Sequence, residues 1–185
     1  MGQYYRPVIL ADNKKTVLTF LSSYDYGNGA KLMEHSYLGN SLVSAFETLI
    51  QDKPQRVVWG GDYADECKNR KTNLYQRCKD SLKAEQIDSK PIAEPNYIIN
   101  HSKKEYVDKK LIRKMKAKWA DGMKIHPLPL LTCEGNLRGG GDYRSDNGSN
   151  YVGSWARDII SVSSKFGDIP KDFKEITPNF GGTEY

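Results

Sequence analysis

The sequence lacks any long apolar run, and it has too few cysteines for a disulfide framework. A membrane-spanning helix needs about 20 predominantly apolar residues, and no stretch of the 185 residues has that character. The three cysteines, Cys67, Cys78 and Cys133, are an odd number without CxxC spacing, so we predict free thiols and no disulfide partner. The first ten residues lack the apolar core and cleavage site of a secretory signal. We therefore expect a cytoplasmic protein that does not bind membranes.

Familiar phosphate and metal motifs are also missing. No glycine-rich string continues into GK[ST] or follows GxGxxG, which excludes a P-loop and a dinucleotide fingerprint. The only three histidines, His35, His101 and His126, have neither HxxxH nor HExxH spacing. A metal site would therefore have to be assembled from distant segments, and His126, which precedes a proline, is the weakest of the three candidates.

The charge is present but concentrated in one segment. The chain has a net charge of +5, and the segment from Lys103 to Lys118 contains eight basic residues and two acids. That segment therefore carries +6 and the rest of the chain −1. Such a patch neutralises phosphates and binds nucleic acid in a salt-sensitive way. We predict that the nucleic-acid-binding residues are Lys103, Lys104, Lys109, Lys110, Arg113, Lys114, Lys116 and Lys118. The alternatives are a solvated helix face that aids solubility, or a surface for an acidic protein partner.

Two segments predict β-hairpins. Gln3–Leu10 and Lys15–Leu21 are rich in β-branched and aromatic residues and flank the turn-forming residues 11–14. Tyr97–His101 and Glu105–Val107 repeat this pattern around a Ser-Lys-Lys turn. Further short strands are predicted near Val57 and Ile159. We expect the two hairpins and these strands to form a mainly antiparallel sheet.

Helical periodicity appears in two places. Ser41–Gln51 has apolar residues on one face after a capping Asn40, and Asp108–Ala120 reads as a basic amphipathic helix. Residues 66–83 suggest a polar helix, whereas His126–Pro129 is expected to be irregular because two prolines exclude a central strand.

The fold class that follows is α+β, a mainly antiparallel sheet built from two hairpins with one or two packed helices. We expect a single domain over residues 1–166, with an internal linker at 84–96 where Pro91 and Pro95 lie. Residues 167–185 read as a surface-draped or frayed tail, since they contain two prolines and two adjacent glycines.

The string Arg138-Gly139-Gly140-Gly141-Asp142 is a candidate anion site. Successive backbone N–H groups in a glycine-rich turn can bind phosphate oxygens, and Arg138 would add a bidentate contact. We predict Arg138, Gly139, Gly140 and Gly141 as phosphate-binding residues. The alternative is a tight loop that packs backbone against backbone.

A second group of residues suggests catalysis. Asp62 and Asp142 both stand in a Gly-Gly-Asp-Tyr string, and two such carboxylates can share a proton or hold a divalent metal. His35 or His101 would act as the acid–base group. The predicted catalytic residues are Glu34, His35, Asp62, His101 and Asp142. The alternative is that each Asp caps its own turn and each His is a hydrogen-bonded structural residue.

Several strings together are similar to known sequences. The strings are MGQYYRPVIL, YDYGNGAKLMEHSYLGN, VVWGGDYAD, INHSKKEYVD, HPLPLLTCEGNLRGGGDY and VGSWARDIIS. They resemble a scattered family of small bacterial and phage proteins that mostly have no assigned activity. The resemblance brings no catalytic residue. It does imply a phage setting, in which many proteins of this size inhibit host defence, anti-CRISPR proteins among them, and act in the host cytoplasm.

Three functions follow as hypotheses. The first is a nucleic-acid-directed phage or prophage protein that inhibits CRISPR–Cas immunity by acting on a guide RNA or its protein–RNA complex. The second is a small hydrolase or transferase, such as a ribonuclease or phosphodiesterase, that acts on RNA or a phosphorylated substrate with or without a divalent metal. The third is a protein-binding module without chemistry.

Overall fold

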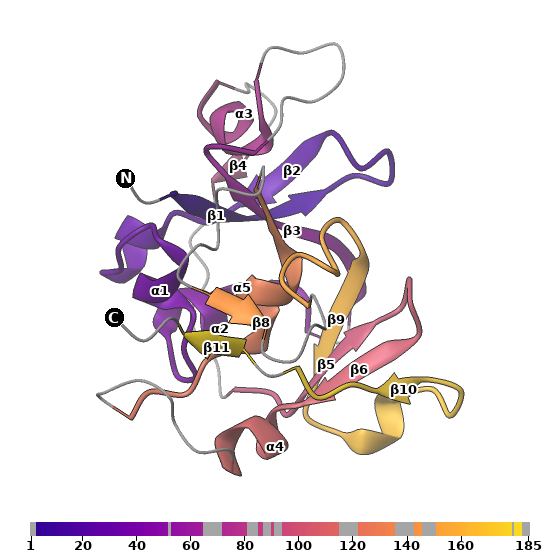
Figure 1. Cartoon of the computed structure of the whole chain (residues 1–185). Coiled ribbons are helices and arrows are strands. Elements are labelled where there is room, and N and C mark those ends of the chain that lie inside the picture. Colours follow the sequence, from indigo (N-terminus) through magenta and orange to yellow (C-terminus); the bar gives the residue numbers. More distant parts are fainter. Residues whose placement is uncertain are drawn as a thin grey trace.

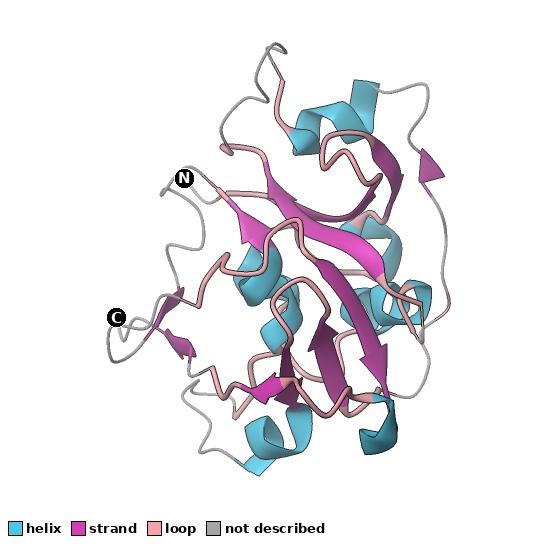
Figure 2. Cartoon of the chain, turned by 90° about the vertical axis from the view of Figure 1, so that its right-hand side faces the viewer, coloured by secondary structure: helices cyan, strands magenta, loops and turns pink. Residues whose placement is uncertain are grey.

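One large mixed sheet forms the centre of the molecule, and helices pack on both of its faces (Figures 1 and 2). The computed structural model describes residues 3–51, 53–64, 72–80, 85–86, 90, 94–114, 122–135, 143–145, 151–178 and 180–182. Within these residues nine strands belong to the sheet, in the order β10–β6–β5–β9–β3–β1–β2–β4, with β7 paired to β3 outside this path. The strands are β1 (Tyr5–Leu10), β2 (Val17–Phe20), β3 (Gln55–Gly61), β4 (Glu85–Gln86), β5 (Tyr97–Asn100), β6 (Glu105–Asp108), β7 (Cys133–Glu134), β9 (Ile159–Ser163) and β10 (Lys174–Glu175).

Most of the strand pairs are antiparallel, which confirms the predicted α+β class. Both hairpins form as expected, β1 with β2 and β5 with β6. The two are joined through β3 and β9, which pair antiparallel with β1 and β5 and with each other. Three short strands pair in parallel: β4 and β10 at the two edges of the sheet, and β7 beside the central strand β3. A separate two-stranded sheet consists of β8 (Tyr143–Ser145) and β11 (Phe180–Gly182).

The helices are short, and α2 is the longest that the structure describes. They are α1 (Leu32–His35), α2 (Ser41–Leu49), α3 (Leu74–Asp80), α4 (Lys109–Lys114) and α5 (Pro127–Thr132), with 3₁₀ turns η1 (Ser23–Tyr26) and η3 (Phe166–Asp168). Asn40 caps α2, since its side-chain oxygen accepts from the backbone N–H of Val43 at 3.2 Å. The predicted helix at Ser41–Gln51 is therefore confirmed.

Strand alternation divides the core between the two faces of the sheet. Successive side chains of a strand point to opposite faces, so Trp59 packs with Phe46 of α2 and Leu131 of α5 in the largest cluster, while Val58 packs with Leu74 of α3 in a second. We call the face covered by α2 and α5 the inner face. The opposite one, on which α3 packs at one end, is the outer face.

A different segment covers the other end of the outer face. There Tyr97, Ile99 and Tyr106 of the second hairpin pack with Ile169 and Phe173 from the segment that follows β9. This segment continues into β10, which adds to the edge of the sheet beside β6. It therefore packs closely against the sheet, and Ile176 and Phe180 beyond it belong to the inner core.

The prediction that His126–Pro129 is irregular is wrong. These residues begin α5, with His126 at its N-cap and Pro127 and Pro129 in its first turn. The first backbone N–H groups of a helix have no partner within the helix, so proline costs little there and its fixed φ suits the helix. The prolines exclude a strand, as expected, but they favour a helix start.

Other predicted elements are described only in part. Of the helix expected at residues 66–83, the structure describes α3, and of the basic helix at Asp108–Ala120 it describes α4. Within the expected linker 84–96, β4 pairs with β2, and residues 94–96 lie against the second hairpin and α4.

Candidate functional site

Glu34 and His35 form hydrogen bonds within their own corner of the inner face. The carboxylate of Glu34 accepts from the backbone N–H of Lys31 at 2.8 Å, at the start of α1. A Cβ atom at Gly29 would overlap that carboxylate, so a larger residue there would displace the end of the Glu34 side chain. His35 is fully buried between Gly29 O and the indole of Trp59.

The hydrogen bonds of His35 determine its protonation. Nδ1 lies 3.1 Å from the Gly29 carbonyl oxygen, which only accepts, so Nδ1 carries the proton. Nε2 then accepts from Trp59 Nε1–H at 3.1 Å. Burial lowers the pKa of His35 to about 4. A neutral imidazole with both nitrogens occupied supports the structure and is not free to transfer protons.

Asp62 bonds to two neighbouring segments where β3 ends. Its Oδ1 accepts from the backbone N–H of Tyr4 at 2.9 Å, and its carbonyl oxygen accepts from Asn73 Nδ2 at 2.7 Å. The glycines before it serve close packing, since a Cβ on Gly61 would lie 2.8 Å from the carbonyl oxygen of Glu134 in β7. The Asp62 carboxylate therefore links the end of β3 to the residue before β1, 58 positions away in the chain, and does not cap its own turn.

His101 lies on the other side of the sheet from His35. Its Nε2 is 2.8 Å from Ser161 Oγ, and Ser161 pairs with Ile99, which belongs to the outer-face cluster. His35 contacts Trp59 of the inner core. The sheet therefore separates the two histidines, and the structure does not bring them into one site.

The remaining predicted site residues lie outside the described residues. They are Arg138, Gly139, Gly140, Gly141, Asp142, Lys116 and Lys118. The glycine-rich anion site and the two distal lysines therefore stay predictions. Of the cysteines, Cys78 and Cys133 are buried free thiols, and burial raises the pKa of each to about 12. Neither suits nucleophilic catalysis, which uses the thiolate. Cys67 is outside the described residues.

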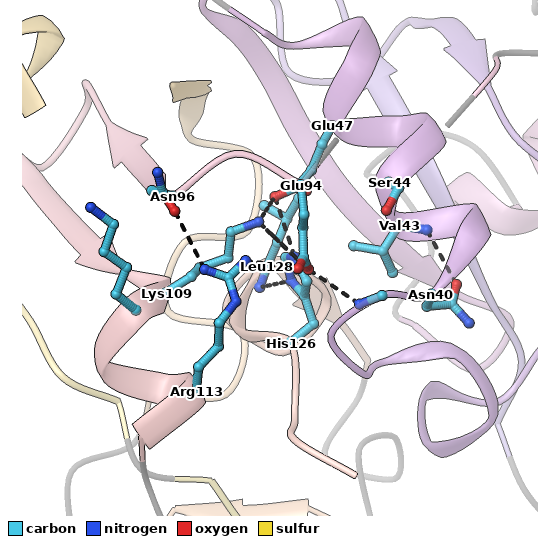
Figure 3. Close-up of polar contacts among 12 residues, drawn as sticks. Asn40, Val43, Ser44, Glu47, Glu94, Asn96, Lys109, Arg113, His126 and Leu128 are labelled. Carbon is cyan, nitrogen blue, oxygen red and sulfur yellow. Dashed lines mark hydrogen bonds and ion pairs between the residues drawn. The ribbon is translucent and has the colours of Figure 1, made fainter. Parts of the chain in front are cut away.

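A cluster of charged residues with a buried centre, which no sequence motif revealed, joins three helices (Figure 3). We call it the ionic centre, and its members are Glu47, Glu94, Lys109, Arg113 and His126. Lys109 Nζ lies 2.6 Å from Glu47 Oε1 and 3.8 Å from Glu94 Oε1, and Arg113 binds the other oxygen of Glu94 at 2.9 Å. Because Lys109 and Glu47 are completely buried, each charge depends on the other for its compensation.

His126 completes the ionic centre as a neutral donor. The backbone N–H of Leu128 donates to its Nδ1 at 3.2 Å, so the proton of the neutral ring is on Nε2. That nitrogen lies 3.2 Å from Glu47 Oε1 and 3.5 Å from Glu94 Oε1. Burial lowers the pKa of His126, and the nearby Lys109 ammonium lowers it further.

The donor atoms of the ionic centre resemble a metal site but already contain a cation. Oxygens of Glu47 and Glu94 and a nitrogen of His126 lie within 4.8 Å of one another. Lys109 Nζ, however, is within 3.2 Å of His126 Nε2 and closer still to Glu47. The ammonium thus supplies the positive charge that these carboxylates need, and we assign the cluster a structural role.

The prediction that Lys109 binds nucleic acid fails because this side chain has no exposed surface. Its position could be recognised from the spacing: Lys109 is two residues after the buried Val107 in β6 and three before the buried Ile112 in α4. The strand period of two and the helical spacing of three both place the Lys109 side chain on the inner face. A lysine at such a position is interpreted as a surface residue unless a buried acid is known to face it.

The other basic residues of the second hairpin and α4 are exposed. Lys103, Lys110 and Lys114 form no ion pair with any residue that the structure describes, whereas Lys104 binds Asp172 at 2.8 Å and Arg113 is held by Glu94. The segment after β9 brings further exposed lysines to this region, because β10 pairs with β6. They are Lys165, Lys171 and Lys174.

An exposed aromatic ring lies among these lysines. Phe166 in η3 is 63% exposed, and its ring centroid is 5.8 Å from that of Tyr97 and 6.3 Å from that of Tyr106. Lys110 Nζ is 5.5 Å from the Tyr97 ring. We call Phe166, Tyr97, Tyr106 and Lys110 the aromatic surface. Sequence reasoning missed it because no motif surrounds Phe166, which is the last residue before the predicted tail.

Beside the aromatic surface, the outer face has a pocket of about 440 Å³. Ile99, His101 and Ser161 line it from β5, its turn and β9, and Gln51, Lys165 and Asp168 line it from the flanking loops. We call it the His101 pocket. Burial lowers the pKa of His101, so its ring is neutral near pH 7, and it packs edge-on against Phe173.

No family model, curated protein or solved structure matches this chain. In the part of the chain that the structure describes, no helix has the length and apolar character needed to cross a bilayer.

We predict that Lys109→Met destabilises the fold by about 3–5 kcal/mol, because it leaves Glu47 buried without its partner. Urea unfolding measures the effect, and Lys110→Met, which changes the exposed neighbour on the same helix, should shift the free energy of unfolding by less than about 0.5 kcal/mol. The double variant Glu47→Leu/Lys109→Met should be more stable than Lys109→Met alone. Equal stability of Lys109→Met and Lys110→Met would contradict the role of the ionic centre.

We also predict that His35 makes the protein acid-sensitive. Its pKa falls from about 6.5 in the unfolded chain to about 4 in the fold, so between these values only the unfolded chain gains the proton. The free energy of unfolding should therefore decrease by roughly 3 kcal/mol as the pH falls from 7 to 4. His35→Gln can keep both hydrogen bonds without titrating and should lose this part of the pH dependence. Parallel stability curves for the two proteins would show that the assignment is wrong.

Proposed function

We propose that this chain binds single-stranded nucleic acid through its aromatic surface and the exposed lysines around it. The observation that carries the proposal is Phe166, a large apolar ring that stays 63% exposed, next to Lys165 in the chain and against the Tyr97 ring that Lys110 contacts. A ring in this position offers a stacking platform for an unpaired base, and stacking contributes about 1–3 kcal/mol per base. Lysines at both ends of the hairpin would hold the phosphates on either side.

Double-stranded nucleic acid is a poorer match for this surface. In a duplex the bases are stacked on one another, and their faces cannot reach a protein ring without unpairing. Phe166 rests edge-on against the buried rings of Tyr97 and Tyr106, which hold it in place. The support is therefore for a strand whose bases are already unpaired.

The hydrolase hypothesis receives less support. Glu34, His35 and Asp62 each bond to neighbouring backbone or to Trp59, and His101 lies across the sheet. A protein partner with an acidic surface would use the same lysines, and the experiments below separate it from nucleic acid. That the target is a guide RNA or a CRISPR–Cas complex stays a prediction, which competition with guide RNA would test.

The contribution of the exposed lysines to RNA binding can be tested by charge reversal. We expect Lys110→Glu/Lys114→Glu to weaken binding to a fluorescent single-stranded RNA at least tenfold in fluorescence anisotropy at low salt. Lys14→Glu/Lys15→Glu is the matched control, because it makes the same change in charge at the turn of the first hairpin. For the unmodified protein, contacts to about four phosphates predict a slope of about −3 for log affinity against log salt. Absence of RNA and DNA binding at low salt, or equal losses in both double variants, would rule out the proposed surface.

The stacking contribution has its own test. Phe166→Ala should raise the Kd for single-stranded RNA about tenfold, since one ring–base stack contributes about 1–3 kcal/mol, and should leave the salt slope unchanged. Tyr24→Ala is the control, because Tyr24 is 66% exposed but lies on η1, away from the second hairpin. An acidic peptide that binds with the affinity of RNA and is equally sensitive to Phe166→Ala would indicate a protein partner instead.

A further inference from the structure

We infer that the His101 pocket binds a guanine base. The inference rests on the proposed function in one respect, namely that the base would belong to the bound strand. Lys165 lines the pocket and directly precedes Phe166, so the pocket and the aromatic surface lie on either side of one short segment of the outer face. A strand that stacks one base on Phe166 can place a neighbouring base in the pocket.

The size and walls of the pocket suit a single base with its sugar. Its volume of about 440 Å³ falls within the range of about 300 to 1,000 Å³ that small-ligand sites occupy. Ile99 and Pro54 provide apolar wall for the faces of a planar ring. The other lining groups are polar, and a ring edge with several donors and acceptors would satisfy them.

The choice among the bases depends on Asp168, the only carboxylate among the described residues that line the pocket. Ser163 Oγ donates to its Oδ2 at 2.5 Å. No hydrogen bond reaches Oδ1 from any residue that the structure describes. Ser163 thus orients the carboxylate and leaves acceptor capacity for a ligand.

Guanine is the base that a carboxylate selects. Its N1–H and its N2 amino group are adjacent donors on one edge, so both can donate to a single carboxylate. Uracil has one N–H between two carbonyl oxygens, which a carboxylate repels. Adenine and cytosine each offer one amino group beside a ring acceptor. The O6 and N7 acceptors of guanine would then require donors, and Gln51 and Ser161 line the same pocket.

His101 has a positioning part in this arrangement. Its Nε2 is 2.8 Å from Ser161 Oγ, which fixes where that hydroxyl lies. Because the ring is neutral and rests on Phe173, it adds a wall without adding charge. The only cation among the described lining residues is Lys165, at the side of the pocket nearest the aromatic surface, where the phosphate of a bound nucleotide would lie.

The test compares short oligonucleotides by fluorescence anisotropy at fixed salt. A uridine hexamer with one central guanosine should bind at least tenfold more tightly than the all-uridine hexamer, and adenosine or cytidine at the same place should not reproduce this gain. Inosine, which lacks the N2 amino group, should lose most of it. Equal affinity for all the hexamers would overturn the inference while leaving the proposed function intact.

Two variants assign the preference to the pocket. Asp168→Asn keeps an acceptor for Ser163 but cannot accept two guanine donors, so it should abolish the guanosine preference and leave binding of the all-uridine hexamer within about twofold. Asp172→Asn makes the same change in net charge outside the pocket and should retain the preference. If Asp168→Asn retains it too, the inference is wrong.

Free guanosine monophosphate separates the two proposals. Asp168-dependent binding of this nucleotide in calorimetry, without binding of any hexamer, would support the pocket and refute the proposed function. No binding of the nucleotide or of any hexamer would refute both.

Discussion

The ion pair between Glu47 and Lys109 ties α4, which directly follows the second hairpin, to α2 on the inner face. Glu47 belongs to α2, which packs on the inner face, and Lys109 is the first residue of α4. Two charges buried at 2.6 Å cannot separate without leaving each of them uncompensated in the protein interior. His126 at the start of α5 donates to the same carboxylate, so three helices share one anchoring point. The exposed lysines of α4 have a defined position because Lys109 is held inside.

The two faces of the sheet differ in what packs against them. The inner face contains the main core, the ionic centre and His35, whose ring is surrounded by groups that keep it neutral. Only short segments pack on the outer face: α3 lies at one end and the segment after β9 at the other. Between this segment and the loop at Gln51 and Pro54 the face is hollowed. Groups available to a ligand are therefore found on the outer face, where packing demands are smaller.

The sequence predicted the elements whose signals are local. Both hairpins and α2 have patterns that a few neighbouring residues determine, and all three form. Interactions between distant segments were not predictable in this way. Nothing near Lys109 in the chain indicates that Glu47, 62 residues earlier, will face it. Pro127 was misjudged for a related reason, because its effect depends on whether it stands inside an element or at its first turn.

Local sequence strings were also a poor guide to the candidate site. Asp62 was predicted as a site residue because it follows two glycines, yet Gly61 is explained by the close approach of the Glu134 carbonyl. Phe166 and Asp168 belong to an ordinary-looking segment, but Phe166 keeps most of its ring in water although the apolar Tyr97 and Tyr106 rings lie beside it. Packing accounts for an unusual string when neighbouring atoms fill the space around it. It does not account for an apolar ring left uncovered, and a stacking partner for Phe166 does.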